Sequence, residues 1–241
     1  MRKKSVGKHL ASDEKAVTFG PGLNFAASEA YRLLRANILF ALPDHGKCRV
    51  IGITSALSGE GKSTTALNLA YVLAESGRKT LLLEADMRLP VVGQRLGLVS
   101  EPGLSNLLAG LCGEEQAVRD SGLHENLWVM PSGDVPPNPS ELLDSGQMKT
   151  VLGNLRKGYD FILLDLPPVN EVSDALVASQ LTDGTLVVVR QGHASRSAMA
   201  EAMRQLQYAE VKILGFVMNY VNNQDGSYYK KGYGGKQTSY G

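Results

Sequence analysis

Ser58-Gly59-Glu60-Gly61-Lys62-Ser63-Thr64 is the stretch that decides the fold of this 241-residue chain. An apolar run at 50–54 precedes it, and a helix-like run begins at Thr65. A buried strand, a glycine-rich turn and a helix N-terminus together place backbone N–H groups and the positive end of a helix dipole around one anion. The stretch therefore predicts a phosphate-binding loop of the Walker A type.

The Walker A pattern assigns a task to each polar side chain of the loop. Lys62 is expected to reach the β- and γ-phosphates of a nucleotide, and the Ser63 hydroxyl to ligate Mg²⁺. The loop departs from G-x-x-x-x-G-K-[ST] where Ala56 replaces the first glycine, so it matters whether that position needs a positive φ. The predicted nucleotide-binding residues are Gly59, Glu60, Gly61, Lys62, Ser63 and Thr64.

The rest of the chain repeats the alternation of strand and helix. Apolar runs lie at 50–54, 80–83, 127–130, 161–164, 185–189 and 213–218, and helical stretches lie near 62–76, 104–118, 140–157, 173–180 and 194–209. Continuous rather than alternating apolar strands indicate burial on both faces. We predict an α/β fold, a mostly parallel sheet with helices on both faces, whose ligands bind at the carboxyl ends of the strands.

Acidic residues follow two of these apolar runs. Glu84, Asp86 and Arg88 come after 81–83, and Asp165 comes after 161–164. An acid at the tip of a buried strand is expensive to desolvate unless it binds metal, hydrogen-bond donors or metal-bound water. Asp165 is therefore interpreted as a Walker B acid. The structural alternative for each acid is a salt bridge or a helix cap.

Composition excludes several classes of protein. The net charge is +1, from 25 basic and 24 acidic residues, so no global field attracts nucleic acid and none is expected as a partner. No apolar run approaches the ~20 residues of a membrane span, and the N-terminus lacks the apolar segment of a signal peptide. We expect a cytoplasmic protein in which Cys48 and Cys112 are unpaired structural residues.

Three regions are predicted along the chain. Residues 1–24 are basic and lack apolar periodicity, which is typical of a flexible arm that is either solvated or in contact with an anionic membrane or a partner. Residues 25–222 form the α/β domain. Residues 223–241 are rich in Gly, Lys and Tyr, with nothing aliphatic to bury the rings, and are expected to be a disordered interaction or modification tail. Its tyrosines are Tyr228, Tyr229, Tyr233 and Tyr240.

A helix is predicted over 28–42 before the domain core begins. Ser28 is its expected N-cap, and Tyr31, Leu34, Ile38 and Leu42 form its apolar stripe. A second N-cap is expected at Ser140, which ends a proline-rich loop that begins at Pro131.

Glu29, Arg32 and Arg35 fall three residues apart on the exposed side of this first helix. Spacing alone favours local pairs on a solvated face, worth ~0.2–0.5 kcal/mol each. The alternative is that these side chains meet complementary groups on a neighbouring subunit, because arginine makes rigid bidentate pairs with carboxylates.

These motifs together resemble the bacterial tyrosine kinases of polysaccharide export over about residues 25–241. The resemblance rests on the Walker A loop, Leu-Leu-Leu-Glu-Ala-Asp-Met-Arg at 81–88, Ile-Leu-Leu-Asp-Leu-Pro-Pro at 162–168, the Pro-Pro-Asn-Pro-Ser-Glu-Leu-Leu stretch at 136–143, Glu-x-x-Arg-x-x-Arg at 29–35 and the tyrosine tail. Each motif occurs in other P-loop ATPases, but the combination is specific to these kinases.

The resemblance implies an ATP-dependent protein-tyrosine autokinase with a P-loop fold of the deviant Walker, Min-like type. It implies a Walker A′ motif at 84–88, catalysis by Lys62, Glu84, Asp86 and Asp165, and Mg²⁺ held by Ser63, Asp86 and Asp165. It also implies a ring oligomer made through Glu29, Arg32 and Arg35, so that contacts with a neighbouring subunit become the favoured reading of this helix instead of local pairs. Finally, it implies that a neighbouring subunit phosphorylates the tail tyrosines Tyr228, Tyr229, Tyr233 and Tyr240.

The implied partners are a transmembrane chain-length regulator that activates the kinase at the inner face of the membrane, and a tyrosine phosphatase. The implied role is regulation of exopolysaccharide polymerisation or export.

One residue departs from the resemblance. The A′ motif of these kinases usually reads Asp-x-Asp-x-Arg, whereas Glu84 occupies its first position here. The extra methylene moves the carboxylate outward, and a misplacement of ~1 Å can lower a rate on the order of 10²-fold. A nucleotide-binding scaffold with weak or no kinase activity is therefore one alternative. A partition- or Min-type ATPase is the other, although Leu57 stands where its second lysine is expected.

Overall fold

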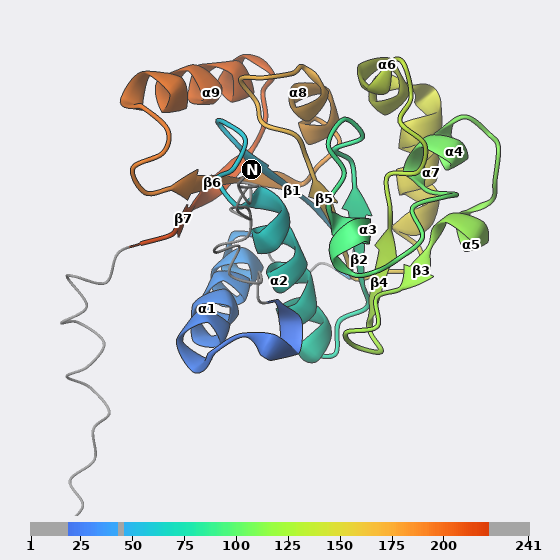
Figure 1. The fold of residues 1–241 in the computed structure, drawn as a ribbon, viewed down its shortest axis with the longest axis horizontal. Coiled ribbons are helices and arrows are strands. Elements are labelled where there is room, and N and C mark those ends of the chain that lie inside the picture. Colours follow the sequence, from blue (N-terminus) through green and yellow to red (C-terminus); the bar gives the residue numbers. More distant parts are fainter. Residues whose placement is uncertain (1–18, 43–45, 222–241) are drawn as a thin grey trace, which may run out of the picture.

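The computed structural model describes residues 19–42 and 46–221 (Figure 1). The elements follow one another in this order: η1 (Gly20–Gly22), α1 (Phe25–Ala41), β1 (Arg49–Ser55), α2 (Lys62–Glu75), β2 (Thr80–Glu84), α3 (Val92–Arg95), α4 (Leu104–Leu108), α5 (Glu114–Ala117), β3 (Arg119–Asp120), β4 (Leu127–Met130), α6 (Pro139–Asp144), α7 (Gly146–Leu155), β5 (Phe161–Asp165), α8 (Asp174–Ser179), β6 (Gly184–Arg190), α9 (Arg196–Tyr208) and β7 (Ile213–Asn219).

The strands form one seven-stranded sheet in the order β3-β4-β2-β5-β1-β6-β7. Every neighbouring pair is parallel except β3 with β4. The predicted mostly parallel sheet is thus confirmed, and each of the six apolar runs is a strand. The edge strand β3 was not predicted, because it has only two residues and no apolar run.

Both faces of the sheet are buried, and Figure 1 shows α1 and α2 on one side with α8 and α9 on the other. Ile51 and Ile53 of β1 pack with α1 and α2, whereas Val50 points to the opposite face, which α4, α7, α8 and α9 cover. In β5, Phe161 and Leu163 alternate with Ile162 and Leu164 in the same way. This two-sided burial explains why the strands are continuously apolar.

The first helix begins three residues earlier than predicted. Its N-cap is Asn24, whose side chain accepts a hydrogen bond of 2.9 Å from the backbone N–H of Ala27. Ser28 is already helical and donates its own N–H to the Asn24 carbonyl, so its assignment as the N-cap was wrong. The apolar stripe is confirmed, with Ile38 buried against α2.

Two predicted helices are each divided. The stretch 104–118 separates into α4 and α5, with Gly110 at φ +72° between them. The stretch 140–157 separates into α6 and α7, and Ser145 caps α7 by accepting the Met148 N–H. Ser140 is not an N-cap, because α6 begins one residue earlier at Pro139, which is favoured at the first helical position.

The ends of the chain are only partly described. Residues 19–24, which fall in the predicted arm, pack on the domain, where Gly20 is buried and donates its N–H to Asn68 Oδ1 at 3.0 Å. Residues 1–18 of the arm and the tyrosine tail lie outside the described residues. Across residues 19–42 and 46–221, no helix combines the length and apolar character that a membrane crossing requires. Cys48 and Cys112 are free thiols, as predicted.

Candidate nucleotide site

The predicted phosphate loop connects β1 to the N-terminus of α2. Gly59 and Gly61 have φ of +76° and +93°, a conformation that glycine adopts without steric cost. Ala56 is fully buried, and it is not among the described non-glycine residues with positive φ. The replacement of the first Walker glycine by alanine is therefore compatible with the loop geometry.

Glu60 holds the loop from inside. Its side chain is buried and accepts hydrogen bonds from the backbone N–H groups of Leu57 at 2.9 Å and Arg190 at 3.3 Å. The sequence placed Glu60 in the loop but did not predict this role for its carboxylate. The bond to Arg190 ties the phosphate loop to the end of β6.

Side chains from three other strand ends also contact the loop. Glu171 accepts from the Ser58 N–H, His193 Nε2 lies 2.9 Å from the Ser58 carbonyl, and Asn219 donates to the Glu60 carbonyl. Sequence reasoning missed these residues. The signal that could have identified them is their position after β5, β6 and β7, at the edge where ligands of parallel sheets bind.

Lys62 forms the central ion pair of the site. Its Nζ lies 2.7 Å from Asp86 Oδ2, and both residues are at least nine-tenths buried. Burial lowers the pKa of Lys62, but the nearby carboxylates of Asp165, Asp86 and Glu84 outweigh it and hold that pKa above its ordinary value. Asp86 also accepts the Leu89 N–H through its other oxygen. Lys62 is thus a buried cation among acids.

Asp165 stands at the end of β5, paired in register with Glu84 of β2 and Ile53 of β1. It is completely buried, and neither of its oxygens accepts a hydrogen bond of ordinary geometry. Burial raises the pKa of Asp165 to about 6, and the charge of Lys62 opposes this rise. Such an acid is costly unless a cation or a donor reaches it, so the residues present fit a divalent ion bound beside the loop.

Glu84 differs from the other acids because its oxygens are fully occupied. They accept the backbone N–H groups of Val91, Val92 and Gly93 at the start of α3, and of Ser132 in the loop after β4. Four donors on one carboxylate hold both segments against the end of β2. The predicted catalytic role of Glu84 stays a prediction.

Arg88 extends the site toward α8. Its guanidinium makes two hydrogen bonds to the buried Asp174, at 2.7 Å and 3.1 Å. Sequence reasoning did not identify Asp174 as its partner. This bidentate pair fixes the turn that follows Asp86.

The residues of the predicted ring interface contact their own chain. Arg32 pairs with Glu29 at 2.7 Å and with Glu75 of α2 at 3.1 Å. Arg35 donates to the Val72 carbonyl at 2.7 Å. The described contacts therefore match the local alternative, and the contact with a neighbouring subunit stays a prediction.

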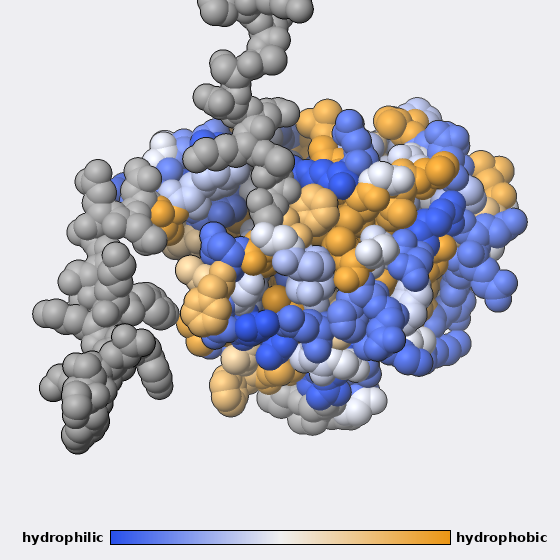
Figure 2. Space-filling view, turned by 60° about the horizontal axis from the view of Figure 1, so that its bottom comes forward, coloured by the Kyte–Doolittle hydropathy of each residue, from blue (hydrophilic) through white to orange (hydrophobic). Residues whose placement is uncertain are grey.

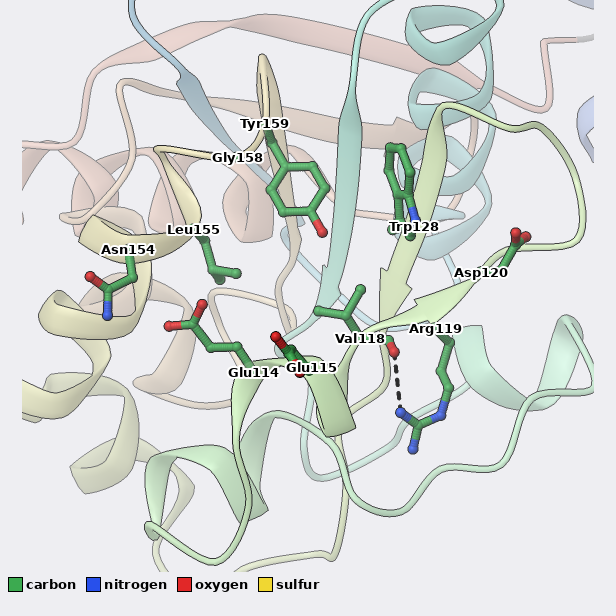
Figure 3. Close-up of a pocket in the computed structure, with 10 residues that line it drawn as sticks. All are labelled: Glu114, Glu115, Val118, Arg119, Asp120, Trp128, Asn154, Leu155, Gly158 and Tyr159. Carbon is green, nitrogen blue, oxygen red and sulfur yellow. Dashed lines mark hydrogen bonds between the residues drawn. The ribbon is translucent and has the colours of Figure 1, made fainter.

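A cavity of about 430 Å³ lies away from this site, between α5, β3, β4 and the end of α7 (Figure 3). The rings of Tyr159 and Trp128 line one side, and Glu114 and Glu115 lie opposite them. The cavity is at the β3–β4 edge of the sheet, whereas the phosphate loop follows the inner strand β1. Backbone N–H groups of a glycine-rich loop bind phosphates, and strand-end acids can hold the metal ion that accompanies a nucleotide. The loop, and not this cavity, is therefore the candidate nucleotide site.

Comparison with known proteins shows the family of the chain. Residues 48–213 match the family described as AAA domain. The chain is 39% identical over 217 residues to the tyrosine-protein kinase YwqD of Bacillus subtilis (strain 168), covering 90% of each chain. The kinase domain of the Escherichia coli tyrosine kinase ETK has a TM-score of 0.78 at 33% identity, covering 86% of this chain and 80% of that one.

The septum site-determining protein MinD of Pyrococcus horikoshii OT3, solved with Mg-ADP, is less similar. Its TM-score is 0.60 at 28% identity, over 71% of this chain and 70% of that one. The Min-type fold is therefore shared, whereas the larger similarity is to the tyrosine kinases.

Proposed function

The chain belongs to the family of bacterial tyrosine-protein kinases, and from this premise we propose that it transfers the γ-phosphoryl group of ATP to tyrosines of its own C-terminal tail. The transfer runs in trans, from the nucleotide of one subunit to the tail of a neighbour. The observation that carries this proposal is the convergence of Lys62, Asp86 and Asp165 beside one phosphate loop.

Ser63, Asp86 and Asp165 are the residues that would hold Mg²⁺, directly or through water. When bound, the ion neutralises negative charge on the β- and γ-phosphates. The complete burial of Asp165 supports this assignment, because the Lys62 charge and the Ser63 hydroxyl offset only part of the cost of burying a carboxylate, and a bound cation would offset more. ATP is the phosphoryl donor and Mg²⁺ is the cofactor.

Lys62 and Asp86 exchange partners when the nucleotide binds. In this structure, each neutralises the other. An ATP molecule in the loop would present its phosphates to Lys62, and Asp86 would then be available to hold the metal or to accept the tyrosine proton. Phosphoryl transfer depends mainly on positioning and on electrostatic stabilisation. The exchange of partners contributes to both, because it places a cation at the phosphates and a carboxylate beside them.

Glu84 contributes by positioning rather than by accepting a proton. Its carboxylate holds α3 and the Ser132 loop while Asp86 and Asp165 face the phosphate loop. The side chain of glutamate is one methylene longer than that of aspartate. This length suits the task, because the carboxylate must reach the N–H groups of Val91, Val92 and Gly93 at the start of α3.

The described part of the chain ends on the nucleotide side of the sheet, shortly before the tyrosine tail begins in the sequence. Strand β7 ends at Asn219, whose side chain bonds to the Glu60 carbonyl of the phosphate loop. Residues 223–241 then span up to ~60 Å at ~3.3–3.6 Å per extended residue, enough to enter an adjacent site. The phosphate acceptors that we propose are Tyr228, Tyr229, Tyr233 and Tyr240.

A ring assembled through α1 brings tail and site together. Groups of hydrophobic side chains reach the surface on the side of the molecule where α1 and the end of α2 lie (Figure 2). On α1 these include Phe25, Leu33 and Phe40, which are 81%, 53% and 83% exposed. We propose that this apolar surface packs on a neighbour while Glu29, Arg32 and Arg35 exchange some of their intrachain contacts for contacts across the interface.

The proposed setting is the inner face of the cell membrane. A transmembrane chain-length regulator recruits and activates the kinase there, and a tyrosine phosphatase reverses the modification. Each phosphate adds about −1.5 to −2 charge, so phosphorylation repels the tail from the acidic site and loosens the ring. This cycle would regulate exopolysaccharide polymerisation or export.

A nucleotide-binding scaffold is the second candidate function. The occupied carboxylate of Glu84 favours it, since that acid is unavailable for chemistry in this structure. The scaffold and the kinase differ in one measurable product, which is phosphotyrosine on the tail.

The test mixes two proteins with Mg·ATP and the membrane activator. One carries Lys62→Met with its tail intact, and the other is active but lacks residues 223–241. Phosphotyrosine on the inactive chain, mapped by mass spectrometry, is the expected result, and an Asp165→Asn acceptor serves as a second inactive chain. Absence of label where the wild-type mixture phosphorylates itself would exclude transfer between subunits. Absence of phosphotyrosine in the wild-type protein as well would exclude the kinase and favour the nucleotide-binding scaffold.

A further inference from the structure

The cavity at the β3–β4 edge of the sheet lies apart from the nucleotide site (Figure 3). Its volume of about 430 Å³ falls within the range of small-molecule sites in proteins. The phosphate loop contributes no residue to its lining. A ligand bound in this cavity would therefore leave the nucleotide site open.

Two aromatic rings form one wall of the cavity. Trp128 belongs to β4 and Tyr159 to the loop between α7 and β5, and their ring centroids are 5.6 Å apart in an edge-to-face arrangement. Both residues are only partly buried. Aromatic faces that stay accessible in a concave site can hold an apolar group or a cation.

Two acids lie across the cavity from these rings. Glu114 and Glu115 belong to the first turn of α5, and Figure 3 shows them opposite Trp128 and Tyr159. Burial raises the pKa of Tyr159, and the charge of Glu114 raises it further, as expected for a carboxylate close to the phenol. The first turn of a helix favours acids, but this preference does not require them to line a cavity.

The protein supplies no cation to these acids in the part of the chain that the structure describes. Glu114 and Glu115 make no ion pair there. Arg119 also lines the cavity, but its guanidinium donates to backbone carbonyl groups, including that of Pro102 at 3.1 Å. Lys157, next to the cavity, donates to Asn154 Oδ1 at 3.1 Å. The cavity thus combines aromatic faces with two carboxylates whose charge is not paired within the described residues.

We propose that this cavity binds an organic cation, namely an alkylammonium or alkylguanidinium group. The charge of the ligand pairs with Glu114 and Glu115, and its apolar stem packs on Trp128 and Tyr159, whose ring faces also attract a cation. The two acids repel an anion, and a neutral ligand would leave their charge unpaired. The proposal is independent of the kinase activity.

Two sources present this chemistry, namely a free polyamine and a lysine or arginine side chain of a protein segment. Trp128 is the single tryptophan of the chain, so tryptophan fluorescence reports on this cavity. The test titrates the full chain with spermidine and, separately, with triarginine amide at constant ionic strength. Calorimetry of the same mixtures measures binding independently of fluorescence. Tighter binding of triarginine amide assigns the protein side chain, and equal or tighter binding of spermidine assigns the polyamine.

The variant is Glu114→Gln with Glu115→Gln, and the matched control is Glu125→Gln with Glu210→Gln, which removes two exposed acids outside the lining. We expect the cation to bind the variant about tenfold more weakly or worse, because charge-assisted hydrogen bonds are lost, and to bind the control like wild type. Circular dichroism verifies that both proteins fold. Equal affinity in all three proteins, an equal loss in variant and control, or no binding of either probe to wild type overturns the proposal.

Discussion

Lys62 Nζ lies 2.7 Å from Asp86 Oδ2, inside the protein and beside the phosphate loop. The cation that should receive the nucleotide is therefore neutralised by an acid that follows β2, two strands away from β1 in the sheet. The same acid is a proposed metal ligand. We therefore expect nucleotide binding and metal binding to be coupled, because a nucleotide that pairs with Lys62 would make Asp86 available to the metal.

Lys62→Met is expected to abolish tight Mg·ATP binding and also to destabilise the fold. The change leaves Asp86 and Asp165 buried without their cation, and breaking a buried pair typically costs about 3 kcal/mol. The loss in the free energy of unfolding should shrink at acid pH, where Asp165, whose pKa is raised by burial to about 6, is protonated. Urea unfolding at pH 5 and pH 7.5, with nucleotide binding by equilibrium dialysis, checks both effects. Unchanged ATP affinity in the folded variant would remove the Walker assignment.

Asp165→Asn should stabilise the metal-free protein above pH 6. The pKa of Asp165 rises from 3.8 to about 6 on folding, so the native state holds a proton that the unfolded state has lost between these values. Stability therefore falls as pH rises through this window, by up to about 3 kcal/mol for a shift of this size. Unfolding from pH 4 to 8 should show this slope in the wild type and not in the variant, which should also bind Mg²⁺ more weakly. The same slope in both proteins would contradict the burial argument.

Glu84→Asp should slow autophosphorylation and loosen α3. The shorter side chain withdraws from the Val91, Val92 and Gly93 N–H groups that Glu84 now holds. Faster amide exchange over 91–93 and 132, with ATP affinity nearly unchanged, is the expected pattern. Glu84→Gln keeps the length and serves as the control for charge. If Glu84→Asp is instead the faster enzyme with normal exchange, the extra methylene was misplacing a catalytic acid.

Arg35→Ala and Arg32→Ala separate packing from assembly. Arg35→Ala removes the bond to the Val72 carbonyl, and we expect a loss of about 1 kcal/mol in stability. Arg32→Ala breaks exposed pairs worth only ~0–1 kcal/mol. Both should lower the mass of the assembled ring in sedimentation. Glu75→Gln is the matched control, because it removes the partner of Arg32 on α2 but leaves Arg32 available to a neighbour. If a variant that carries both Arg32→Ala and Arg35→Ala assembles into a ring of normal mass, the two arginines make only contacts within their own chain.

Much of the site could be predicted because it depends on local pattern. The phosphate loop was predicted from its Walker A motif, and Asp86 and Asp165 were noticed because they follow buried strands, whose carboxyl ends meet at one edge of a parallel sheet. The partners of these residues could not be found in that way. Asp174 and Glu171 reach the site from loops and helices far along the chain, and nothing in their spacing predicts which group they meet.

The sequence by itself determined six of the seven described strands, their burial and the edge at which a nucleotide is expected to bind. The strands follow from hydrophobic patterning, which acts over a few residues, and the edge follows from the parallel arrangement of the strands. Only the tertiary structure decided that Glu84 holds α3, that Asn24 caps α1, and that Arg35 bonds to α2. A polar side chain forms a hydrogen bond with the group that the packing of the chain brings within about 3 Å of it. Packing depends on the whole chain, so local sequence does not specify this partner.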